Sequence, residues 1–265
     1  MKFIRLFTVA ALSTTILAGG SINVLAEETS ELRGTNSDGQ IEFVPDNGPL
    51  EVIPPEEGPD VELHPDVEGT TGPLSIVKVS QMDFGTQVIS TSDENYNMVA
   101  EMQQLIGTEG EEGLVPYVSF AQVQDLRGNN EGWQLRLSLD EFTSDTQNGV
   151  LTAAELHLDD PRIQYSGRDE NQAPSAHGTR LTLIPGGSGQ PIMTANTGQG
   201  AGASSVVWGN QADLNAQFAD LDNLENQVVE NKNIILSVPG STAKDAAIYT
   251  STLTWELTAA PGADV

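Results

Sequence analysis

The stretch GWQLRLSLDEF, residues 132–142, decides the fold class. Large apolar side chains occupy every second position of its centre, and polar side chains occupy the positions between them. The apolar set is Trp133, Leu135, Leu137 and Leu139, and the polar set is Gln134, Arg136, Ser138 and Asp140. Successive side chains of a β-strand point to opposite faces, so this alternation predicts a strand with one face in a core.

The last part of the chain repeats this alternation. In IYTSTLTWELT, residues 248–258, one predicted face carries Tyr249, Ser251, Leu253, Trp255 and Leu257. Shorter strand-like runs cover residues 74–80, 82–90, 117–125, 151–158, 179–184, 204–209 and 233–239. Because Gly, Pro, Asn and Asp separate these runs, we expect tight turns between neighbouring strands. The pattern predicts an all-β protein, an antiparallel β-sandwich of Greek-key type.

Three segments depart from the strand pattern. Residues 213–227 carry leucines and Phe218 near helical spacing, which predicts a short helix or an ordered loop. The glycine-rich segments 184–191 and 196–202 have no lysine after them and no strand–loop–helix context. They are therefore expected to be turns between strands and not phosphate-binding loops.

Composition divides the chain into three parts. Residues 1–26 combine Lys2 and Arg5 with an apolar run and a small residue, Ala26, which is the pattern of a signal peptide. Residues 27–72 hold 13 acidic residues, one basic residue and six prolines. Charge repulsion and stiff prolines predict an extended, disordered, solvated spacer there, with a recognition tail for a cationic partner as the alternative. Residues 73–265 are expected to form the folded domain.

Charge and cysteine content exclude several classes of function. The 265 residues include 38 Asp and Glu against 11 Lys and Arg, a formal net charge of −27. Nucleic-acid binding through phosphates needs clustered Lys and Arg, so it is not expected. The absence of cysteine excludes disulfides, thiolate metal sites and cysteine nucleophiles. No second apolar run has membrane length, so no direct membrane insertion is expected after signal cleavage.

Two Trp-x-Leu tripeptides give the chain a family resemblance. The first, Trp133–Leu135, lies within QDLRGNNEGWQLRLSLDEF, and the second, Trp255–Leu257, lies within YTSTLTWELTAAPG. PLSIVKVSQMDFGTQ precedes both, and a signal peptide precedes the whole. In these frames the tripeptides resemble the WxL domain of Gram-positive surface proteins, over roughly residues 73–265. The resemblance implies a secreted protein held non-covalently on the cell wall, with peptidoglycan as the ligand, and a possible part in complexes with other surface proteins.

The motif residues Trp133, Leu135, Trp255 and Leu257 have two interpretations. Each tryptophan shares a strand face with leucines, which favours packing in the core. Alternatively, an exposed indole would be a platform for a sugar ring. The third tryptophan, Trp208, stands at a strand end beside Gly209, and of the three it is the better candidate for an exposed aromatic, although packing in the core remains the preferred interpretation.

The remaining chemistry-bearing residues indicate structure more than catalysis. Asp125 and Arg127 lie two residues apart and are expected to form a structural ion pair or hydrogen-bond clamp at the loop before the first motif. His157 and His177 have no histidine nearby in sequence as a co-ligand. No metal site and no cofactor are expected. The motifs HExxH, GxSxG and SxxK are absent from the sequence, so the protein is not expected to be an enzyme.

Three functions remain in order of preference. The first is a non-catalytic protein bound to cell-wall peptidoglycan. The second is a protein–protein module that docks on a membrane- or wall-anchored partner, by strand addition at an open sheet edge. The third, a hydrolase acting on wall glycans or peptides, ranks below both, because among so many carboxylates some pair meets any glycosidase spacing by chance.

Overall fold

The computed structural model describes residues 38–46, 48, 51–63, 67–221 and 227–259. The expected signal peptide lies outside these residues. The chain divides into two units, Met1–Glu42 and Phe43–Val265, and the second holds every strand and helix of the described structure. Within the described part, no helix combines the length and the apolar character that crossing a membrane requires.

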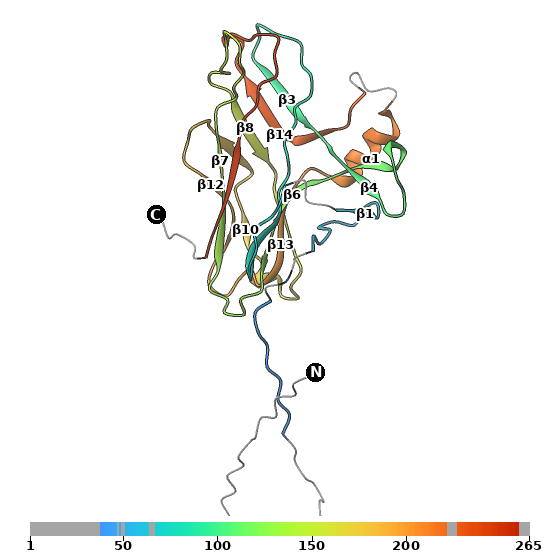
Figure 1. Cartoon of the computed structure of the whole chain (residues 1–265), viewed down its shortest axis with the longest axis vertical. Coiled ribbons are helices and arrows are strands. Elements are labelled where there is room, and N and C mark those ends of the chain that lie inside the picture. The colour runs from blue at the N-terminus through green and yellow to red at the C-terminus, as the bar shows by residue number, and fades with distance from the viewer. Residues whose placement is uncertain (1–37, 47, 49–50, 64–66, 222–226, 260–265) are drawn as a thin grey trace, which may run out of the picture. The chain divides into compact units, whose positions relative to one another are not determined.

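The protein is all-β, and every strand pair in the described structure is antiparallel (Figure 1). The motif sheet has the order β10 (Ser175–Ala176), β12 (Gln190–Ala195), β7 (Trp133–Leu139), β15 (Leu253–Thr258). The strap sheet has the order β2 (Leu74–Lys78), β6 (Ser119–Asp125), β13 (Gly202–Trp208), β9 (Arg162–Tyr165). The third sheet has the order β11 (Arg180–Leu183), β8 (Glu155–Asp159), β14 (Glu230–Val238), β3 (Glu94–Val99). The expected all-β, antiparallel class is confirmed, and the Greek-key sandwich order stays a prediction.

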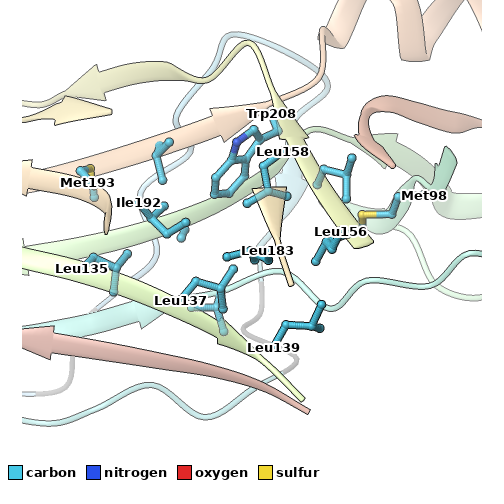
Figure 2. Packing of buried hydrophobic residues seen from close by; sticks show 14 of the residues in the cluster. Met98, Leu135, Leu137, Leu139, Leu156, Leu158, Leu183, Ile192, Met193 and Trp208 are labelled. Atoms are coloured by element: carbon cyan, nitrogen blue, oxygen red, sulfur yellow. The ribbon is translucent and has the colours of Figure 1, made fainter. Parts of the chain in front are cut away.

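One hydrophobic core joins these three sheets (Figure 2). Its members come from alternate positions of the central strands, as the alternation along residues 132–142 predicts. The inward residues of β7 are at most 1% exposed, and the residues between them are half-buried. The labelled core residues in Figure 2 are Met98, Leu135, Leu137, Leu139, Leu156, Leu158, Leu183, Ile192, Met193 and Trp208.

A smaller apolar cluster lies under a fourth sheet and the helix. The sheet has the order β1 (Val61–Glu62), β4 (Glu101–Leu105), β5 (Leu114–Tyr117), with a short 3₁₀ helix, η1 (Glu111–Gly113), before β5. A second 3₁₀ helix, η2 (Glu170–Gln172), follows β9. The helix α1 (Gln211–Ala219) begins at Asn210, whose side chain accepts hydrogen bonds from Ala212 N and Asp213 N. It buries Leu214 in the cluster, so the helical option for residues 213–227 holds as far as residue 219.

The spacer prediction required residues 27–72 to be solvated throughout. Part of this acidic segment is instead bound to the domain. Residues 51–56, here called the strap, lie against the outward face of the strap sheet. The side-chain amide of Gln122 accepts from Ile53 N at 2.9 Å and donates to Ile53 O at 2.7 Å. Gln124 donates to Glu51 O at 3.0 Å. Val61 of β1 is then only 7% exposed. Glutamine side chains bind the strap's backbone, which a prediction from charge and proline content cannot detect.

Two features of the strand prediction need correction. Residues 82–90 form no strand, because Asp83 Oδ1 accepts from Gly85 N in a turn and Val88 is 88% exposed. The predicted runs also leave out seven strands of the described structure, namely β1, β3, β4, β5, β9, β10 and β12. The sequence of β3, ENYNMV, shows why, since it is half-buried and rich in polar residues. Its partner β14 supplies the pairing from more than 130 residues away in sequence.

Candidate functional site

The first motif lies in a central strand. β7 pairs with β12 on one side and with β15 on the other. Trp133 and Leu135 are both fully buried, and the indole Nε1 of Trp133 donates a hydrogen bond to Gly200 O at 3.0 Å. The indole therefore buries its ring without losing a hydrogen bond from its one polar group.

The turn after β12 forms the contact surface for Trp133. Gly200 adopts φ +77°, and a Cβ atom there would lie 2.6 Å from the indole nitrogen. Gly132, before the motif, adopts φ +82°, and its Cβ would lie 2.4 Å from Ala195 O. The expected turn at residues 196–202 is present, but its close approach to the tryptophan was not predicted. The three glycines of GQGAG, residues 198–202, are the only sequence signal for it.

The second motif lies in an edge strand. β15 is the last strand of the motif sheet in the described structure. Trp255 and Leu257 are half-buried and pack on the main core, opposite Leu137 and Leu135 of β7. The two Trp-x-Leu strands are thus hydrogen-bonded neighbours, although 122 residues separate the tryptophans.

Arg127 joins the two motif strands at one end. Its guanidinium donates to both carboxylate oxygens of Asp125, at 2.9 and 2.7 Å, as the sequence predicted. It also donates to Gly132 O, just before the first motif, and to Ala259 O, just after the second strand, at 2.8 and 3.3 Å. Hydrogen bonding to Asp125 raises the pKa of Arg127, so the clamp carries its charge at any physiological pH. The reach of Arg127 to the second motif was not predicted.

Trp208 is a buried residue, in agreement with the preferred core interpretation, and the alternative of an exposed aromatic is wrong. The side chain is 0% exposed and lies within the main core in Figure 2. Its Nε1 donates to His177 Nε2 at 3.0 Å, and the two rings stack with centroids 5.9 Å apart. Burial lowers the pKa of His177, which favours the neutral imidazole that this hydrogen bond requires. Gly209 follows the last residue of β13, and the turn there does not expose the indole ring of Trp208.

The open surface beside β15 is a polar groove. Its volume is about 600 Å³, and its lining residues are Asp140, Glu141, Thr143, Gly186, Thr250, Ser251 and Thr252. Carboxylates and hydroxyls are hydrogen-bond partners for sugar hydroxyls and peptide amides. Among the described residues no three His, Asp or Glu side chains gather closely enough to hold a metal ion. His157 instead bonds Thr182 and Ser237, within the third sheet.

The fold and the paired motif strands define a class, a β-domain built around two neighbouring Trp-x-Leu strands. The family model for the WxL domain, described as surface cell wall-binding, matches residues 30–261. The chain belongs to the WxL family and is a cell-wall-associated surface protein. Neither curated proteins nor solved structures gave a match to this chain. The match includes the strap, in agreement with its hydrogen bonds to the strap sheet.

Proposed function

We propose that this protein binds peptidoglycan directly and non-covalently, and that it performs no catalysis. The family match carries the proposal, because residues 30–261 include every strand and helix in the described part of the chain and the family is a wall-binding one. Burial of Trp133 and Leu135 supports a structural role for the first motif. The ligand then contacts a different part of the domain.

The polar groove beside β15 is the surface we assign to the wall. Asp140 and Glu141 are exposed there, next to the hydroxyls of residues 250–252. Such groups pair with sugar hydroxyls over short distances. Long-range attraction is not available, because a chain of net charge −27 is repelled by anionic wall polymers. Short-range contacts in a repulsive field predict that retention on the wall increases as salt or acidity rises.

Binding of the secreted chain to sacculi stripped of protein tests the proposal. We expect stronger retention at high salt than at low salt. Thr252→Trp places an indole in the groove and should weaken retention by about tenfold, a loss of about 1.4 kcal/mol. Thr197→Trp, at an exposed position in the turn after β12, is the matched control and should leave retention unchanged. Retention that falls steeply with salt would contradict the proposal.

The second candidate, docking on a membrane- or wall-anchored protein, predicts a different result. The observation that favours it is the free edge of β15, which offers backbone groups for strand addition. A docked module binds intact cells and fails to bind stripped sacculi. Equal binding to both supports the peptidoglycan proposal.

Catalysis is tested separately. We expect no soluble muropeptides after prolonged incubation of the chain with sacculi. Release of muropeptides that stops when Asp140 and Glu141 are both changed to alanine would overturn the non-catalytic assignment.

A further inference from the structure

The polar groove beside β15 opens onto the outward face of the motif sheet. Asp140 and Thr252 line the groove, and Asp140 N donates to Thr252 O at 2.9 Å. Asp140 follows the last residue of β7, and Thr252 precedes the first residue of β15. Since side chains alternate between the faces of a sheet, the even-numbered residues of both strands share the face of these two. The groove and this face therefore form one continuous surface.

Polar side chains occupy the outward face along both motif strands. The opposed pairs, taken from the groove along the strands, are Ser138 with Thr254, Arg136 with Glu256, and Gln134 with Thr258. Thr254 and Glu256 are exposed, as is Thr252 in the groove. In the described structure no hydrogen bond engages the side-chain hydroxyls of Ser138, Thr252 and Thr254. These hydroxyls are available to a ligand.

Charge is balanced between the two strands on this face. Arg136 stands opposite Glu256, and its guanidinium donates to Gln134 Oε1 at 3.2 Å and to Gly189 O at 2.6 Å. The chain as a whole carries −27, so a wall polymer meets less repulsion here than over a surface of average charge. The strap sheet differs, because the acidic strap lies on its outward face.

We propose that the outward face of β7 and β15 binds the glycan strand of peptidoglycan. The strand enters at the groove and lies over Ser138 and Thr254, toward the Arg136–Glu256 pair. The stem peptides that it carries point away from the sheet. This inference rests on the proposed wall binding and names the part of peptidoglycan that is bound.

A glycan strand fits this surface better than a stem peptide does. Sugar hydroxyls and N-acetyl groups exchange hydrogen bonds with hydroxyl and amide side chains without needing a charged partner. The free carboxylate of a stem peptide needs a cation, and Arg136, the one cation on this face among the described residues, is already engaged. An extended peptide binds through its backbone at a strand edge and not on a sheet face. Hydrogen bonds between uncharged groups are also little screened by salt, in agreement with retention at high salt.

Competition for sacculi stripped of protein is the first test. An amidase separates sacculi into soluble glycan strands and stem peptides, which are purified and added to the secreted chain at high salt. We expect the glycan strands to lower retention on intact sacculi by about tenfold, and the stem peptides at equal concentration to leave it unchanged.

A charge placed on the face is the second test. Thr254→Glu adds a carboxylate at an exposed position beside Glu256, and it should weaken retention on sacculi by about tenfold. Thr91→Glu, at an exposed position outside the motif sheet, is the matched control with the same change in net charge and should leave retention unchanged. The urea midpoints of both variants show whether the fold is intact.

The outcomes separate this inference from the proposed function. Retention that stem peptides abolish and glycan strands do not would overturn the inference and leave peptidoglycan binding in place. Equal retention of folded Thr254→Glu and Thr91→Glu chains would also overturn it. A wild-type chain that does not bind stripped sacculi at any salt concentration would overturn the proposed function, and the inference with it.

Discussion

The two Trp-x-Leu motifs have the same spacing and occupy adjacent strands, but they lie in different environments. Trp133 is fully buried in a strand with two neighbours, and its indole nitrogen has a backbone partner. Trp255 is half-buried in a strand with one neighbour. The same tripeptide therefore completes the core in one place and lines an edge in the other.

The difference shows that position within the sheet determines the role of a motif. A central strand is covered by side chains from both neighbours, whereas an edge strand leaves part of its apolar face and half its backbone groups accessible. The first motif is thus suited to stability and the second to association. Substitutions in matched pairs can break or sharpen this distinction.

The largest expected effect separates the two tryptophans. Trp133→Ala removes a fully buried indole and leaves Gly200 O without its donor, so it should lower the free energy of unfolding by about 4 kcal/mol. Trp255→Ala removes a half-buried indole and should lower it by about 2 kcal/mol or less. Urea denaturation followed by circular dichroism measures both. Equal losses would remove the distinction between central and edge motifs.

The clamp between the motif strands should have the next largest effect. Arg127→Met leaves the buried carboxylate of Asp125, 3% exposed, without its partner. The loss should be about 3 kcal/mol, since removing one member of a buried pair strands a charge. Arg180→Met breaks the exposed pair with Asp159 and is the control, with little change expected. If both variants unfold at the wild-type urea concentration, the clamp does not stabilise the motif strands.

The glycine turn over Trp133 should give a smaller but specific effect. Gly200→Ala combines a φ of +77° with a contact of 2.6 Å to the indole nitrogen, and about 2 kcal/mol should be lost. Gly198→Ala is matched in conformation, with φ +88°, but its Cβ would meet nothing within 4 Å. Gly198→Ala should therefore lower the free energy of unfolding by about 1 kcal/mol, half the loss expected for Gly200→Ala. The difference measures the steric contacts of the added Cβ with Trp133 and with Ala195, and a zero difference would exclude them.

The smallest effect concerns pH and the third tryptophan. Burial, the largest cause, lowers the pKa of His177 below its ordinary value of 6.5. The unfolded chain then binds a proton at a higher pH than the folded chain, so stability is complete above about pH 6.5 and declines as pH falls below it. His177→Gln removes this titrating group. The urea midpoint should then change less with pH between pH 7 and pH 5 than it does in the wild-type chain. An unchanged slope would show that His177 does not couple to folding.

Much of the fold could be predicted from alternation alone. The alternation in residues 133–139 is strict, and the burial pattern of β7 follows it residue by residue. The segment 94–99 has no such alternation, and β3 forms because β14 pairs with it. Pairing between distant segments is a property of the whole chain, so a local pattern cannot reveal it. The strap was missed for the same reason, because its partners are Gln122 and Gln124 in a strand that begins more than 60 residues later.

The site was only partly predictable. The motif residues and the Asp125–Arg127 pair follow from spacing, and their contacts are as expected for packing and for a clamp. The alternative of an exposed Trp208 is wrong because a glycine beside a strand end indicates a turn but does not show which residues pack over the ring. In the structure those residues include His177, 31 residues earlier in the chain.

By itself the sequence determined the all-β class, the family and the pairing chemistry of Arg127 with Asp125, since each depends on residue type and local spacing. Only the tertiary structure decided that β7 is central and β15 is an edge, that Trp208 is enclosed, and that the strap binds a sheet face. Those outcomes depend on which distant segments share a sheet. Burial is decided by the side chains that arrive from those segments, and no short stretch of sequence contains them.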